Sequence, residues 1–216
     1  MDKKDLKKLV KADFSEFLKE LGFSKKSEGV YIKVNDNIIQ NITFEFGSIG
    51  FTCWVVMQPL YVKDYTNFLH LSFGSSLGRF KSFKRNWWSY EEPVKGISEI
   101  KELLIENGLP WFDEYGTSKG IIDFISSGKV EEYGFWFNER YQKQYLGFSL
   151  LYSGRIDEGI KALNCMICEI GENAADFVKA YNKDMIELLG RIKENPEETP
   201  SIIDGIIAEN RLALKI

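Results

Sequence analysis

Residues 79–88 carry the strongest chemical signal in the chain, because this segment combines four basic and four aromatic side chains with no acid. Aromatic rings stack on nucleic-acid bases while cations neutralise phosphates, and arginine and tryptophan also dominate protein interfaces. We expect a protein or peptide partner, since a net charge of −4 argues against a dedicated nucleic-acid-binding domain. The residues expected to make this contact are Arg79, Lys84, Arg85, Trp87 and Trp88. The alternative is a loop or hairpin whose aromatic rings fold inward while its lysines face water.

Cys165 and Cys168 form a single Cys-x-x-Cys pair. A structural zinc site needs four ligands, and the spacing of Cys53 and His70 does not supply the other two. A redox pair of the thioredoxin type would open a helix, whereas this pair lies inside one that begins near Ile156. We therefore predict that both cysteines act as small buried apolar residues, and we expect no metal and no cofactor.

Linear motifs for catalysis are missing from the chain. His70 is the only histidine, which excludes any mechanism that needs two. The run from Gly74 to Gly78 fits neither a nucleophile elbow nor a phosphate-binding loop. The sequence therefore identifies no catalytic residue. A competing hypothesis is an enzyme whose site is assembled from scattered residues on a sheet, for instance Arg85, Glu45, His70 and Tyr90.

The elements that would position these residues differ between the two parts of the chain. Apolar residues at three- and four-residue steps over 6–21 predict a helix, which Gly22 would cap. Residues 30–34, 38–46 and 51–58 read as strands, and the short turns between them require antiparallel pairing. Residues 67–73 and 87–90 are further candidate strands. The fold class is therefore α+β, with the N-terminal helix packed on an antiparallel meander of about four to five strands.

Helices dominate the rest of the sequence. Residues 97–108 predict a helix that breaks at residues 109–112, and Thr117 is a possible N-cap for a helix over 117–126. Four helical segments follow Asn138, over 141–152, 156–170, 173–193 and from Thr199 onward. We expect an α+β domain over residues 1–138 and a helical subdomain over residues 139–216 packed on it.

Three stretches together resemble a known family. They are residues 21–26 with Tyr31 and the strand at 40–42, residues 109–113 with 121–124 after them, and residues 145–151 with 154–160. In this order they are similar to bacterial proteins of domain-of-unknown-function family 4304. The resemblance implies an α+β domain and carries no catalytic residues. The last stretch also resembles one tetratricopeptide-type helical hairpin, but the pattern does not repeat about 34 residues later as an array requires.

The composition narrows the class of protein. Hydrophobic residues make up 44% and charged residues 28% of the 216, which is typical of a globular protein with a real core. The charged start predicts no signal peptide, no apolar run is long enough to span a membrane, and three cysteines do not form a disulfide framework. The sequence therefore predicts a cytoplasmic bacterial protein that is a non-catalytic binding or immunity-type accessory protein, with a nucleic-acid accessory factor as a further alternative.

Overall fold

The computed structural model describes residues 3–63, 73–82, 87–133, 139–169 and 174–216. These residues fall into two compact units. Unit 1 comprises Met1–Gln58, Leu71–Gly116 and Gly128–Trp136, and unit 2 comprises Pro59–His70, Thr117–Ser127 and Phe137–Ile216. The segment at residue 59 and the helix after Thr117 therefore group with the helices that follow residue 138.

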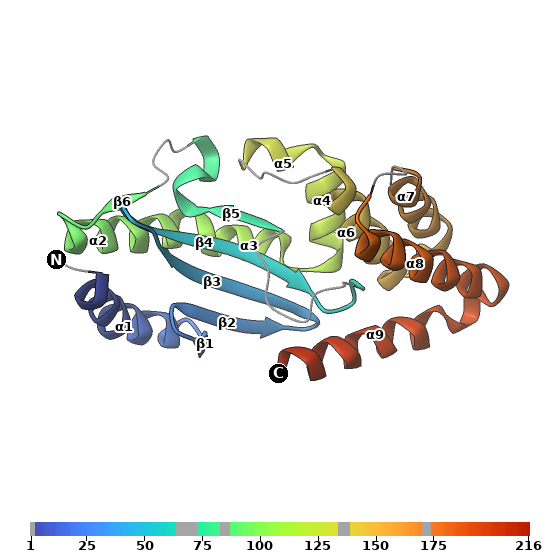
Figure 1. Cartoon of the computed structure of the whole chain (residues 1–216), viewed down its shortest axis with the longest axis horizontal. Coiled ribbons are helices and arrows are strands. Elements are labelled where there is room, and N and C mark those ends of the chain that lie inside the picture. The colour runs from blue at the N-terminus through green and yellow to red at the C-terminus, as the bar shows by residue number, and fades with distance from the viewer. Residues whose placement is uncertain (1–2, 64–72, 83–86, 134–138, 170–173) are drawn as a thin grey trace. The chain divides into compact units, whose positions relative to one another are not determined.

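Unit 1 is an α+β unit, as the sequence predicts, and is built on a six-stranded sheet. The neighbouring strands follow the order β1 to β5, and β6 also pairs with β4 (Figure 1). The β1–β2, β2–β3, β4–β5 and β4–β6 pairs are antiparallel. The strand bounds are β1 Ser24–Ser27, β2 Val30–Asn35, β3 Ile38–Phe46, β4 Gly50–Pro59, β5 Gly74–Ser76 and β6 Trp88–Ser89.

The sequence located β2, β3, β4 and β6 but not β1. β1 reads Ser-Lys-Lys-Ser and has no apolar residue, so no alternation marks it as a strand. The strand predicted over residues 67–73 lies outside the described residues except for Phe73, whose carbonyl accepts a hydrogen bond from the Met57 N–H. The short strand β5 begins at the next residue, Gly74.

One face of the sheet is covered by α1, Lys3–Glu20. Leu6, Phe14 and Leu18 are fully buried along this helix, and the ring of Phe14 lies 4.7 Å from that of Phe44 on β3. Gly22 ends the helix with a positive φ of 84°, which confirms the predicted cap.

Further helices cover the same face of the sheet beside α1. They comprise α2, Pro93–Leu103, a π-helical turn over Leu104–Gly108, and α3, Leu109–Tyr115. Lys101 of α2 forms an ion pair with Asp13 of α1 at 2.9 Å and lies over the rings of Phe14 and Phe17 at 5.5 and 5.4 Å. The two helices therefore share a partly buried cation at their contact. The small helix α5, Lys129–Glu132, also belongs to unit 1.

The predicted break at residues 109–112 is wrong. The chain stays helical, because the N–H of Leu109 bonds to the carbonyl of Leu104, five residues back, and the π-helical turn absorbs one extra residue. Pro110 then lies at the start of α3, directly after the π-helical turn. The insertion keeps Leu104, Trp111 and Phe112 buried in the same unit.

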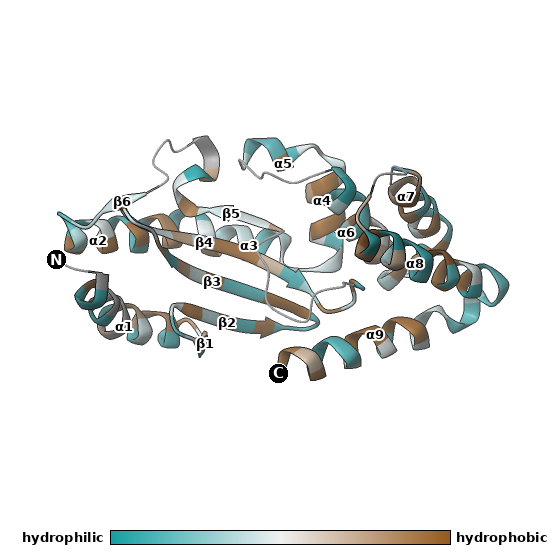
Figure 2. Ribbon diagram, viewed as in Figure 1, coloured by the Kyte–Doolittle hydropathy of each residue, from teal (hydrophilic) through white to brown (hydrophobic). Residues whose placement is uncertain are grey.

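Unit 2 is helical. It contains α4 Ser118–Ser126, α6 Glu139–Tyr152, α7 Ile156–Cys168, α8 Asp176–Glu194 and α9 Thr199–Leu214. Thr117 caps α4 as predicted, because its hydroxyl accepts a hydrogen bond from the N–H of Gly120 at 3.0 Å. Apolar and polar residues are interleaved along α8 and α9 (Figure 2), and on α9 the isoleucines at 202, 203, 206 and 207 are buried.

The closest helix pair in unit 2 is α6 and α7, joined by a turn in which Gly154 has a φ of 76°. A Cβ placed on Gly147 would lie 2.5 Å from Cγ of Leu163, and one on Gly159 would lie 2.9 Å from the carbonyl oxygen of Gly147. The helices approach so closely because neither glycine has a side chain. This confirms a helical hairpin over these residues.

The segment that follows β4 is bound to these helices. The ring of Tyr61 stacks on Tyr152 with centroids 4.4 Å apart, and its hydroxyl lies 3.1 Å from that of Ser149. The side-chain amide of Asn210 donates to the carbonyls of Leu60 and Val62 at 2.8 and 3.0 Å. Residues 59–63 are therefore part of the core of unit 2.

None of the helices in the described part of the chain is both long enough and apolar enough to cross a membrane.

Candidate functional site

The structure places three of the five predicted contact residues. Arg79 is half-buried in the 3₁₀ helix Leu77–Ser82, Trp87 is half-buried, and Trp88 is only 2% exposed. Lys84 and Arg85 lie outside the described residues. The indole N–H of Trp88 donates to the carboxylate of Glu99 at 2.9 Å, so this ring anchors the segment to α2. Trp87 thus has more ring surface within reach of a partner than Trp88.

Trp87 lies against the turn between β3 and β4. A Cβ on Gly47 would come within 2.8 Å of Cζ3 of Trp87, so the ring can sit there only because position 47 has no side chain. The hydroxyl of Tyr90 donates to the carbonyl of Gly47 at 2.8 Å, and β6 pairs with β4 at Gly50. These contacts fix the chain around Trp87 to the turn.

A pocket of about 210 Å³ opens beside these contacts. It is lined by Trp87, Trp88, Ser89, Glu92, Lys95 and Gly96. Glu92 and Lys95 are 3.4 Å apart, but both are exposed, so their ion pair is weak and each remains available to a ligand.

Two exposed aliphatic residues belong to the chain segments that make these contacts. Ile49 is 73% exposed in the turn whose glycines contact the tryptophans, and Val94 is 68% exposed between the pocket residues Glu92 and Lys95. We call this combination the hairpin-end surface, formed by Ile49, Trp87, Ser89, Glu92, Val94 and Lys95. It brings together three chain segments, and the sequence indicated only one of them.

The scattered-residue enzyme hypothesis needs Glu45 and Tyr90 to meet. Glu45 accepts a hydrogen bond from the indole of Trp54 at 2.9 Å, which places both side chains on one face of the sheet. Tyr90 instead packs against Phe51, whose side chain projects to the opposite face from Trp54 because side chains alternate along β4. The structure therefore does not bring Glu45 and Tyr90 together. His70 and Arg85 lie outside the described residues.

A cluster of titratable groups that the sequence did not indicate joins α5 to α3. The ammonium of Lys129 donates to the Tyr115 hydroxyl at 2.7 Å and lies 3.4 Å from the carboxylate of Glu114. The Tyr115 hydroxyl also donates to Glu114, and the ring of Tyr133 meets that of Tyr115 edge-on. Fourteen residues separate Tyr115 from Lys129, so no local motif marks the group.

The pKa shifts in this cluster favour neutral phenols. Burial raises the pKa of Tyr115, and the neighbouring Glu114 adds to the shift. Burial also raises the pKa of Tyr133 to about 12, with smaller contributions from Tyr115 and Glu114. The hydrogen bond to Tyr115 raises the pKa of Lys129. A catalytic base needs a pKa near neutrality, so these shifts run against that role and are typical of a structural tie.

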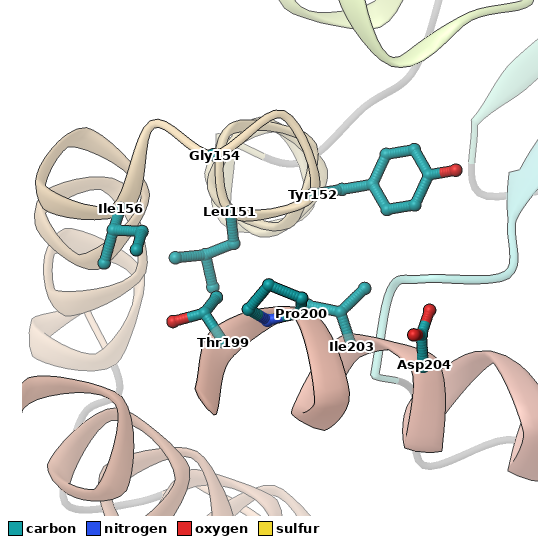
Figure 3. A pocket seen from close by; sticks show the side chains of 8 residues that line it. All are labelled: Leu151, Tyr152, Gly154, Ile156, Thr199, Pro200, Ile203 and Asp204. Carbon is teal, nitrogen blue, oxygen red and sulfur yellow. The ribbon is translucent and has the colours of Figure 1, made fainter. Parts of the chain in front are cut away.

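Unit 2 contains a smaller cavity of about 140 Å³. Figure 3 shows Leu151 of α6 and Ile156 of α7 facing Pro200 and Ile203 of α9 across it, with the carboxylate of Asp204 at one side. Sites for drug-sized ligands usually occupy about 300–1,000 Å³. The cavity therefore has room for one apolar side chain rather than for a cofactor.

The prediction that Cys165 and Cys168 are buried is wrong, because both are exposed. Gly159, Leu163 and Met166 form the buried stripe of α7, and the two cysteines lie outside it. The described residues hold no group of three or more His, Cys, Asp or Glu side chains placed to bind a metal.

Comparison with known proteins adds no relative: no family model matches the chain, and neither does a curated protein or a solved structure. The resemblance to family 4304 therefore stays a prediction. Any functional assignment has to be argued from the chain's own geometry.

Proposed function

We propose that this protein binds another protein through the hairpin-end surface and does not act by catalysis. The observation that carries the proposal is the exposure of two aliphatic residues, Ile49 in the turn that contacts Trp87 and Val94 next in sequence to the pocket residue Lys95. Arg79, Lys84 and Arg85 are the predicted basic contributors from the neighbouring segment.

The arrangement has the anatomy of a protein interface. Interfaces combine apolar and aromatic residues at the centre with a polar rim. Here Ile49, Trp87 and Val94 supply apolar surface, and Glu92 and Lys95 supply charged groups of both signs. Full burial of each aliphatic side chain by a partner would contribute about 1.5–3 kcal/mol.

The pocket indicates the kind of partner. At about 210 Å³ it has space for a single large side chain, and its lining offers tryptophan rings together with a carboxylate and an ammonium. We infer a folded partner that inserts one aromatic or aliphatic residue. In the immunity-type version of the proposal, this contact covers a functional site of the partner.

The test is affinity capture from a lysate of the source organism with matched variants of the full chain. Ile49→Asp and Val94→Asp each place a charge on the hairpin-end surface, and Ile105→Asp makes the same change at a residue that is 54% exposed outside it. We expect one stoichiometric protein that the wild type and Ile105→Asp retain at high salt and that the other two variants lose.

Equal retention by all four proteins would contradict the proposed surface. Binding that disappears at high salt in the wild type, and that nuclease treatment abolishes, would instead indicate nucleic acid, since phosphate contacts are strongly salt-dependent.

A further inference from the structure

The cavity of unit 2 has a buried floor and an exposed rim. Leu151, Thr199 and Ile203 line it and are each only 2% exposed. Pro200 and Asp204 also line it, and both are exposed. The hydroxyl of Thr199 already donates to a backbone carbonyl at 2.7 Å, so the floor is mainly apolar. A ligand can therefore enter at the rim and place an apolar group on the floor.

The volume of the cavity sets the size of that group. A cavity of about 150 Å³ lined by aliphatic and aromatic side chains can hold one benzene molecule, and this cavity measures about 140 Å³. Leu151, Ile156 and Ile203 supply aliphatic surface of the same kind (Figure 3). One aromatic ring or one branched aliphatic group of similar size therefore fits.

The carboxylate of Asp204 adds a negative charge at the side of the cavity (Figure 3). Within the described part of the chain this carboxylate takes part in no hydrogen bond or ion pair. Arg155 follows the lining residue Gly154, but its guanidinium donates two hydrogen bonds to Glu158, at 2.8 and 2.6 Å. Asp204 is therefore available to a cation that enters the cavity.

The helix ends around the cavity agree with a cationic ligand. Helix N-termini attract anions, and α7 and α9 both begin here, but acids already lie at these ends. Asp157 is in the first turn of α7, and Glu197 and Glu198 directly precede α9. The C-terminal end of α6, which attracts cations, also borders the cavity. The charges around the cavity thus disfavour an anion.

We propose that this cavity binds a small organic amine. Its single aromatic or branched aliphatic group fills the space between α6, α7 and α9, and its ammonium pairs with Asp204. Binding is non-covalent, so the ligand leaves unchanged. The site lies within unit 2 and is separate from the hairpin-end surface, which belongs to unit 1.

The experiment is a titration of the full-length protein with benzylamine, followed by NMR of the methyl groups. Benzyl alcohol is the matched ligand without a charge. We expect both ligands to shift the methyl signals of Leu151 and Ile203, and benzylamine to bind roughly two- to fivefold more tightly, the range of an exposed ion pair. Asp204→Asn should lower the affinity for benzylamine to that for benzyl alcohol and leave the latter unchanged.

Asp184→Asn is the matched control, because Asp184 is an exposed aspartate on α8 that does not line the cavity. This variant should bind both ligands as the wild type does, and the methyl spectra of both variants check folding.

Four results would overturn the proposal. The first is no shift of the Leu151 and Ile203 methyl signals at about 20 mM benzylamine, where even a weak ligand of this size is detected. The second is equal affinity of the wild type for the two ligands. The third is an unchanged affinity for benzylamine in Asp204→Asn. The fourth is an equal loss in Asp184→Asn, which would indicate a general effect of surface charge.

Discussion

At the residue scale, the cluster of Glu114, Tyr115, Lys129 and Tyr133 shows how burial decides what an ionisable group can do. The carboxylate, the phenol and the ammonium are within hydrogen-bonding distance, an arrangement that often accompanies acid–base chemistry. Burial nevertheless keeps the tyrosines protonated. The result is a polar tie that fixes α5 to the end of α3.

This tie predicts a loss of stability in alkaline solution. The pKa of Tyr133 is about 12 in the folded protein against an ordinary 10.0. Because the folded protein holds the Tyr133 proton more tightly than the unfolded chain does, this group stabilises the fold. Its contribution to the free energy of unfolding is fully present below pH 10 and is lost as the pH rises through about 12. Phenolate absorbance should therefore show a late titration step that Tyr133→Phe removes. A late step of unchanged size in that variant would contradict the assignment.

At the element scale, the contact of α6 with α7 depends on two glycines. Gly147→Ala should lower the free energy of unfolding by about 1–3 kcal/mol, because its Cβ would overlap Leu163. That cost outweighs the gain of about 1 kcal/mol in helix propensity.

Gly190→Ala is the matched control, since apart from its chain neighbours and the backbone of α8 no atom lies within 4 Å of the added Cβ. This variant should be neutral or more stable by up to about 1 kcal/mol. Urea denaturation gives the free energy of unfolding of both variants. A change of the same sign and size in both would show that close packing against α7 is not the reason for glycine at position 147.

At the scale of the whole molecule, the grouping of the chain predicts how a fragment behaves. Residues 139–216 include Gln144, Tyr181 and Asn210, whose side chains bond to the carbonyls of residues 60, 62 and 63. Without that segment Asn210 loses both carbonyls, and Gln144 and Tyr181 keep only their bond to each other. A buried polar group that loses its partner costs about 1–3 kcal/mol. We expect the fragment 139–216 to melt at a lower temperature and with less cooperativity than the full chain, as measured by circular dichroism. A sharp transition at the full-chain midpoint would show instead that these helices need nothing before residue 139.

The extent of sequence-based prediction follows from how local each signal is. The α1 stripe with its Gly22 cap, the turn between β3 and β4 and the Thr117 cap are all set by neighbouring residues, and each was predicted. The π-helical turn was missed because Pro110 indicates a break unless the preceding turn is known to shift its hydrogen bonds. The hairpin-end surface was found only in part, since the sequence does not show that the apolar residues Ile49 and Val94 are exposed in the fold. Burial of the cysteines was predicted wrongly because a helix has two faces and the pair alone does not say which one it occupies.

The hydrogen bonds between Asn210 and the segment after β4 also affect when this part of the fold can form during synthesis. Asn210 and Leu60 are 150 residues apart, and ribosomes add roughly 5–20 residues per second. The carbonyls of Leu60 and Val62 therefore emerge about 8–30 seconds before the side chain that binds them is made. A chain that terminates before residue 210 never supplies the amide that these two carbonyls accept from, although Tyr61 can already stack on Tyr152.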